Sequence, residues 1–179
     1  MRAAGMSRID HIDFQKRTQP LAYLLTFRCY GTWLHGEERG SVDRRRYHRY
    51  GTPDMPANEK ILSDERRTLK SEPLLLNKPQ RETIQAAIRE VCESRHYSLH
   101  AISVRTNHVH VVVGSIQKPE LVLGSFKSYA TRRLREAHLL QAGIKPWARH
   151  GSTKYLWTDE RLQRAIEYVN FGQGDEPFT

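Results

Sequence analysis

The sequence predicts an α+β fold in which two helices cover one face of an antiparallel sheet, with core elements in the order βαββαβ. Two segments, 21–30 and 107–113, carry the residues and the periodicity of strands. Between and after the strands lie apolar stripes with helical spacing. A long basic insertion after the first strand and an added C-terminal helix complete the pattern. Without these two additions the order is the ferredoxin-like arrangement.

Length and charge narrow the class of protein. The 179 residues are predicted to form one domain, 1–179, with a loose polar lead-in at 1–20. Lysine and arginine number 29 against 20 acidic residues, for a net charge of +9. This excess predicts a polyanionic partner, most simply nucleic acid, and the alternative is a basic surface kept for solubility.

Membrane and secreted classes are not favoured. No apolar run approaches the roughly 20 residues that a membrane span needs, and the N-terminus lacks the apolar region of a signal peptide. The two cysteines, Cys29 and Cys92, each fall inside a predicted element. We therefore expect a reduced, cytoplasmic protein with no membrane partner.

The first strand, Leu21–Tyr30, alternates between two apolar faces. One face carries Leu21, Tyr23, Leu25, Phe27 and Cys29, and the other Ala22, Leu24, Thr26, Arg28 and Tyr30. The insertion follows at 32–73, and a short helix is predicted within it over 59–70. Its middle is basic, rich in tyrosine and interrupted by glycine and proline. Arginines can fork onto phosphates and tyrosines can stack on unpaired bases, so DNA binding is predicted for Arg44, Arg45, Arg46 and Arg49. The alternative is a solvated loop without a partner.

A helix and a hairpin follow the insertion. Asn77 is the predicted N-cap, with Gln80 at the third helical position, and the helix runs to about Arg95. A strand from Tyr97 to about Arg105 then pairs with the strand at 107–113 through a tight connection at Thr106–Asn107.

The second core helix begins at Pro119, and Gly143 is its predicted C-cap. Its expected buried face holds Val122, Phe126, Tyr129, Ala130, Leu134, Ala137 and Leu140. Its exposed side is nearly all positive, which makes Lys127, Arg132 and Arg135 candidate DNA-binding residues or simply a solvated face.

The chain ends in a short strand and a helix. Residues 145–151 are predicted to be a loop and Lys154–Trp157 a strand, after which Thr158 caps the last helix. Leu162, Ala165, Ile166 and Val169 form the core stripe of this helix. The core helices occupy one sheet face, so we expect the last helix to complete the other.

A histidine pair stands out on the strand at 107–113. His108 and His110 point to one face, with Cα atoms about 6.5 Å apart, while Val109, Val111 and Val113 point to the core. Two adjacent imidazoles can bind one divalent metal ion. The alternative is that the two histidines have no metal-binding role and simply lie on the solvent-exposed face of a strand. His100, on the neighbouring strand, is expected to share the face of Ile102 and Val104 and to be structural.

These residues resemble the HUH single-strand endonucleases, named for the pattern His-hydrophobic-His, here His108-Val109-His110. More narrowly, the chain resembles the single-tyrosine transposases of small insertion sequences and their REP-associated relatives. The resemblance rests on the first strand, the segment 106–113, the helix around 126–134, and a last helix that holds a tyrosine. It implies a ferredoxin-like fold, nicking of single-stranded DNA beside hairpins or repeats, a 5′-phosphotyrosine intermediate, and Mg²⁺ or Mn²⁺ at the histidines.

Two tyrosines are candidate nucleophiles. Tyr129 lies on the apolar stripe of its helix, which favours a core role. Tyr168 lies just off the stripe of the last helix, where the family carries its nucleophile, and is the predicted catalytic residue. Insertion-sequence relatives place a glutamine four residues later as third metal ligand, but that position is Gly172 here. Gln173 is the predicted substitute, if Gly172 ends the helix.

Two other functions remain open. One is a catalytically inactive transposase that binds hairpin DNA or RNA without cutting. It is favoured by the absence of a glutamine at position 172. The other is an RNA-binding module, because some such modules share the ferredoxin-like plan, although no aromatic-rich segment marks the histidine strand. The resemblance also leaves open whether the protein is a homodimer that exchanges the tyrosine helix or acts alone.

Overall fold

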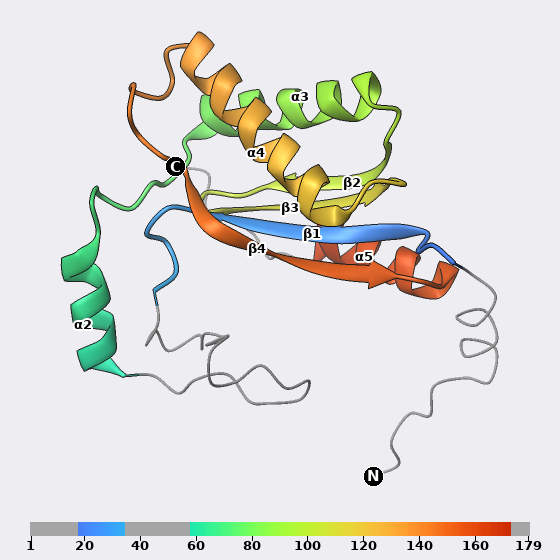
Figure 1. Ribbon diagram of the computed structural model, residues 1–179, viewed down its shortest axis with the longest axis horizontal. Helices are drawn as coiled ribbons and strands as arrows, with labels where there is room; N and C mark the ends of the chain where they lie inside the picture. The colour runs from blue at the N-terminus through green and yellow to red at the C-terminus, as the bar shows by residue number, and fades with distance from the viewer. Residues whose placement is uncertain (1–17, 35–57, 173–179) are drawn as a thin grey trace.

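The computed structural model describes residues 18–34 and 58–172 of the chain. In it a four-stranded antiparallel sheet separates two helical layers (Figure 1). The strand order is β2-β3-β1-β4, which is the ferredoxin-like order. The strands are β1 (Ala22–Cys29), β2 (Ser98–Val104), β3 (His108–Gly114) and β4 (Trp147–Leu156). The predicted fold class is confirmed.

The first layer is formed by α3 (Lys78–Ser94) and α4 (Pro119–Glu136). Asn77 and Gln80 form the predicted capping box at the start of α3. Both helices pack on the strand face that carries Leu25, Phe27 and the odd-numbered valines of β3, and these residues form the larger hydrophobic core. Burial of this face fixes the register of the strands, because a slip of one residue would turn every side chain over.

The second layer is α5 (Asp159–Phe171), which lies on the other face of the sheet, as expected (Figure 1). The Thr158 hydroxyl caps α5 by accepting from the Arg161 N–H. Leu162, Ala165 and Val169 pack with Ala22, Leu24, Ala101 and Val112 in a smaller core. This core lies toward one end of the sheet and ends beside His110.

The described part of the insertion includes the predicted helix, α2 (Glu59–Thr68), which is capped by Asn58 and buries none of its residues. Figure 1 shows α2 standing away from the sheet. Among the described residues, no helix is long and apolar enough to cross a membrane.

The end of α4 differs from its prediction. The helix ends at Glu136 rather than near Leu140, and Gly143 is not its cap. His138 adopts a left-handed backbone with φ 57°. The N–H groups of His138 and Leu139 then bond back to the carbonyls of Arg135 and Leu134, which is a Schellman motif. The chain therefore turns away early, and Ala137 is exposed rather than buried.

The last strand is longer than predicted. β4 begins at Trp147, because Trp147 packs edge-to-face on Phe27 with ring centroids 5.0 Å apart. Its indole N–H donates to the Lys127 carbonyl and the Thr131 hydroxyl. Residues 145–151, predicted to be a loop, thus mostly extend the sheet. The first half of this strand was not predicted because Pro146 and Gly151 are residues typical of loops.

The position of His100 is also a correction. The pairing of β2 with β3 shifts between Leu99 and Ala101, so strict alternation fails there. His100 is consequently exposed, whereas Ile102 and Val104 pack against the larger core. The expectation that His100 shares the face of Ile102 and Val104 is wrong.

Candidate functional site

The histidine pair lies on the sheet face that α5 only partly covers. His108 and His110 point the same way from β3, and their ring centroids are 4.6 Å apart at an interplanar angle of 77°. His110 is buried and His108 half-buried. The rings are therefore close enough to serve one ion, as the strand periodicity predicts.

Each imidazole is oriented by a neighbouring side chain. The Nδ1 of His108 lies 2.5 Å from Asn107 Oδ1, and the Nδ1 of His110 lies 2.7 Å from Thr26 Oγ1. An amide oxygen only accepts, so His108 donates through Nδ1, and its Nε2 carries the lone pair that a metal needs. A hydroxyl can play the same part for His110. Such partners fix both tautomer and ring orientation.

Tyr168 approaches the pair from α5. Its ring centroid lies 5.6 Å from that of His110, at an interplanar angle of 74°, and the side chain is 46% exposed. Ala165 and Val169, which flank it in sequence, are buried against the sheet. Their packing holds Tyr168 at the rim of the covered area, beside His110 and partly exposed.

The alternative nucleophile lies elsewhere. Tyr129 is on α4 and packs against the larger core, with the Arg132 guanidinium carbon 4.4 Å from its ring centroid. Figure 1 shows the sheet between α4, which carries Tyr129, and α5, which carries Tyr168. Of the two candidates, only Tyr168 lies beside the pair.

The predicted third metal ligand stays a prediction. α5 ends at Phe171, with Gly172 as C-cap, so the helix ends where predicted. Gln173 lies outside the part of the chain that the structure describes. Within residues 18–34 and 58–172, no group of three or more His, Cys, Asp or Glu side chains could hold an ion. The donors present fit an ion that takes its remaining ligands from phosphate and water, as Mg²⁺ and Mn²⁺ do.

The candidate DNA-binding residues are divided. Arg44, Arg45, Arg46 and Arg49 lie outside the described residues. Lys127, Arg132 and Arg135 lie on α4, across the sheet from the histidines. Lys127 is not on an open charged face, since its ammonium donates to the carbonyls of Ala148 and His150 and burial lowers its pKa. Arg132 pairs with Glu136, and Arg135 donates to the Ile144 carbonyl. The structure therefore does not bring these three together with the histidine pair.

Thr26 and Asn107 were given no role from sequence. Thr26 is on the outer face of β1 and Asn107 precedes the first histidine, but only the pairing of β1 with β3 puts Thr26 opposite His110. The available signal was that Thr26 follows two apolar residues, Ala22 and Leu24, on the same strand face.

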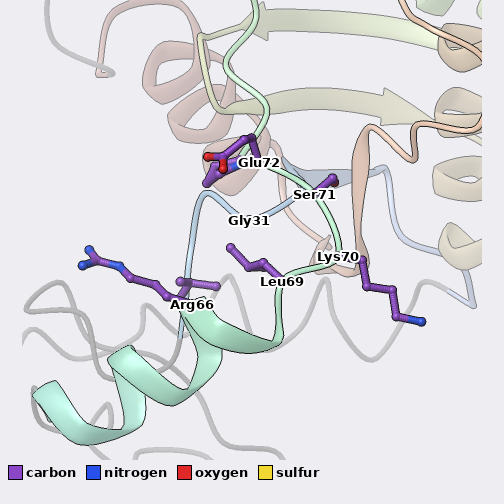
Figure 2. A pocket seen from close by; sticks show the side chains of 8 residues that line it. Gly31, Arg66, Leu69, Lys70, Ser71 and Glu72 are labelled. Carbon is purple, nitrogen blue, oxygen red and sulfur yellow. The ribbon is translucent and has the colours of Figure 1, made fainter.

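A separate cavity of about 630 Å³ lies between the end of β1 and α2. It is lined by Gly31, Leu34, Arg66, Leu69, Lys70, Ser71, Glu72 and Pro73. Figure 2 shows the Arg66 and Lys70 side chains extending away from each other. Their charges do not converge on one point, and neither histidine of the pair lines the cavity.

Comparison with known proteins finds one matching family model and similar solved structures. The family model described as "Transposase IS200 like" matches residues 68–160, more than half of the chain, including both histidines. A REP-associated tyrosine transposase bound to a REP hairpin is 10% identical, with a TM-score of 0.48 over 100% of this chain and 76% of that one. A candidate transposase from Deinococcus radiodurans R1 is 14% identical, with a TM-score of 0.44 over 87% and 92% of the two chains. No curated protein matches the sequence.

Proposed function

The chain belongs to the family of IS200-like transposases, and from that premise we propose that it cuts and rejoins single-stranded DNA through Tyr168. The observation that carries the proposal is the contact between Tyr168 and His110, with centroids 5.6 Å apart, on a face where two oriented imidazoles adjoin. A nucleophile beside a pair of nitrogens that can bind a metal ion is what such a reaction needs.

In the proposed reaction the Tyr168 hydroxyl attacks the phosphorus of a phosphodiester. The bond from phosphorus to O3′ breaks, the phosphate stays on the 5′ end as a phosphotyrosine, and the other strand leaves with a 3′-hydroxyl that gains the proton lost by the tyrosine. A divalent ion, when held by His108 and His110, supplies positive charge that offsets the phosphate oxygens. One ester replaces another, so a 3′-hydroxyl can reverse the step and rejoin DNA.

The proposed substrate is DNA that carries a hairpin or a repeat beside the cut. The net charge of +9 supports a polyanionic partner. Tyr168 lies beside His110 of its own chain, so the proposed reaction needs no second copy. α5 also covers part of the sheet face on which an RNA-recognition module would stack bases, which disfavours that function.

The experiment is a denaturing gel of labelled, hairpin-bearing single-stranded DNA taken from repeats that flank the gene. Wild type with Mg²⁺ or Mn²⁺ is expected to give a covalent protein–DNA band that a chelator abolishes. Tyr168→Phe and His108→Ala should lose the band, and Tyr129→Phe should keep it. A band that persists in Tyr168→Phe would contradict the assignment.

A second function, a retired transposase that binds such DNA without cutting, is favoured by one observation. Gly172 stands where the resemblance implies a ligand, and glycine has no side chain to offer. Binding without any adduct, with both metals and a range of hairpins, would select this function.

A further inference from the structure

We propose that Arg28, stacked on Trp33, forms a binding site for a phosphate of single-stranded DNA beside the histidine pair. The inference rests on the proposed function, because it places a second phosphate next to the one that Tyr168 attacks. It adds a site that the sequence pattern did not identify.

The sheet puts Arg28 on the same face as the histidines. In the pairing of β1 with β3, Thr26 lies opposite His110 and Arg28 lies opposite His108. Directly opposed residues of antiparallel strands point to the same side, with Cβ atoms about 4.5–5.5 Å apart. The hydrogen bond between Thr26 and His110 shows that this face is shared, and Arg28 is two residues further along the strand.

Trp33 holds the guanidinium in place. The Arg28 guanidinium carbon lies 3.1 Å from the centroid of the Trp33 ring. A flat guanidinium on an aromatic face is restrained in orientation, and its N–H groups lie in the plane parallel to the ring. Less side-chain entropy is then lost when those N–H groups bind a ligand.

The loop that carries Trp33 is fixed by a tight turn at Gly31 and by hydrogen bonds to β1 and Asn107. Gly31 has φ 72°, and a Cβ there would lie 3.0 Å from Pro73 Cα, so only glycine suits this turn. The Thr32 hydroxyl lies within hydrogen-bond distance of the carbonyls of Cys29 and Asn107. Leu34 is buried. Asn107 thus contacts both His108 and the Trp33 loop, which ties the arginine–tryptophan stack to the histidine pair.

The chemistry of the stack fits a nucleic-acid strand. A guanidinium binds phosphate oxygens through two parallel N–H bonds, and an aromatic–arginine stack can extend onto a base. Tyr168 lies beside His110, and one step along the strands His108 and Arg28 lie opposite each other on β3 and β1. In phosphoryl transfer the attacking and leaving oxygens are roughly in line. Arg28 lies one step along the strands from the level of Thr26 and His110, so the phosphate that it would bind is next to the one that Tyr168 attacks.

The test is DNA binding without metal, so that its outcome is independent of cleavage. Fluorescence anisotropy with a labelled oligothymidylate in a chelating buffer would compare wild type, Arg28→Gln and Arg89→Gln over a range of salt concentrations. Arg89 is the matched control, an exposed arginine on α3 across the sheet. Arg28→Gln is expected to bind about tenfold more weakly. Its salt slope should fall by about 0.7, the value for one phosphate contact on a single strand. Arg89→Gln should change neither.

A second variant guards against loss of folding. Trp33→Leu keeps every charge and leaves β1 intact, and it is expected to weaken binding about threefold through loss of the stack. Thermal unfolding would verify that each variant is folded. Equal affinities for wild type and a folded Arg28→Gln, or equal losses in Arg28→Gln and Arg89→Gln, would overturn the site. Failure of the proposed function would appear separately, as binding that depends on Arg28 with no covalent adduct.

Discussion

At the scale of single residues, two neutral side chains determine what the histidine pair can do. Asn107 and Thr26 hydrogen-bond the Nδ1 atoms of His108 and His110, which leaves Nε2 of each ring to bind the proposed ion. Because Asn107 and Thr26 carry no charge, they orient the two rings without offsetting the positive charge that the proposed ion would offer to phosphate.

Removing the Thr26 hydroxyl without changing its shape tests this orientation. Thr26→Val is expected to weaken Mn²⁺ binding about 10- to 100-fold, as loss of such a partner commonly does. Isothermal titration calorimetry would measure the change. Ser152→Ala is the control, because Ser152 is an exposed residue of β4 that lies opposite Thr26 of β1. An unchanged affinity in Thr26→Val would show that the hydrogen bond does not orient His110.

The site was predictable where it depended on periodicity. The alternation of a strand put His108 and His110 on one face, and the stripe of a helix put Tyr168 at its edge. Thr26 was not predictable, because its role depends on which residue of β3 lies opposite, and register is a property of two strands. Lys127 was misplaced because helical spacing does not show that β4 approaches it closely enough for its ammonium to donate to two carbonyls.

At the scale of elements, the ends of both core helices carry a strained histidine. His96 after α3 and His138 after α4 have φ values of 55° and 57°, and each begins a Schellman motif. A side chain with a Cβ pays about 1–2 kcal/mol for this conformation. Glycine avoids that cost but loses more backbone entropy on folding.

His138→Gly is therefore expected to raise the free energy of unfolding by about 0.5–1 kcal/mol. His138→Ala, which keeps a Cβ, should not. Urea denaturation of the three proteins would show the difference, and a destabilised glycine variant would mean that the His138 side chain itself contributes to the fold.

Two glycines give a matched test of how closely β4 approaches β1. A Cβ on Gly151 would lie 2.7 Å from the Thr26 carbonyl oxygen and 2.9 Å from Leu123 Cδ2, whereas a Cβ on Gly124 in α4 would contact nothing within 4 Å. Gly151→Ala is expected to cost about 1–3 kcal/mol of stability. Gly124→Ala should add about 0.5–1 kcal/mol, because alanine favours the helix.

The free energy of unfolding from urea titrations would separate the two substitutions by sign. If Gly151→Ala were neutral, β4 would have room beside Thr26, and its early start at Trp147 would be in doubt. This contact also explains why the first half of β4 was not predicted. A glycine in a sequence favours a loop, and only the structure shows that Gly151 is needed for the close approach of β1.

At the scale of the whole molecule, the two faces of the sheet differ: one packs against the larger hydrophobic core, and the other carries the candidate functional site. The face under α3 and α4 holds the larger core, and the face under α5 holds a smaller core and the histidine pair. The element order predicted this division, because two crossover helices fill one face of a βαββαβ sheet. It could not predict the left-handed turns that end α3 and α4, which are set by local hydrogen bonds.

Two thiols and a phenol buried in the larger core predict that the folded state loses stability at alkaline pH. Burial raises the pKa of the Cys29 thiol from 9.0 to about 12 and that of Cys92 to about 11, and it raises the pKa of Tyr23. The folded state holds these protons more tightly than the unfolded chain does. Stability should therefore fall as the pH rises from 9.0 toward about 12. Lys127, whose pKa burial lowers, acts in the opposite sense.

The slope of urea midpoint against pH in this window would measure the effect. Cys29→Ala should be less stable at neutral pH through lost packing, yet its slope above pH 9.0 should be shallower than that of wild type. Equal slopes would show that the Cys29 thiol does not titrate with unfolding.

The measurement that tests the central claim most directly is the identity of the residue that carries DNA after cleavage. Wild-type protein incubated with hairpin-bearing single-stranded DNA and Mn²⁺ would be digested with nuclease and protease, and the peptides analysed by mass spectrometry. The account predicts a nucleotide linked through its 5′-phosphate to Tyr168. A nucleotide on Tyr129, across the sheet from the histidines, or an adduct that forms equally well in His108→Ala, would contradict it.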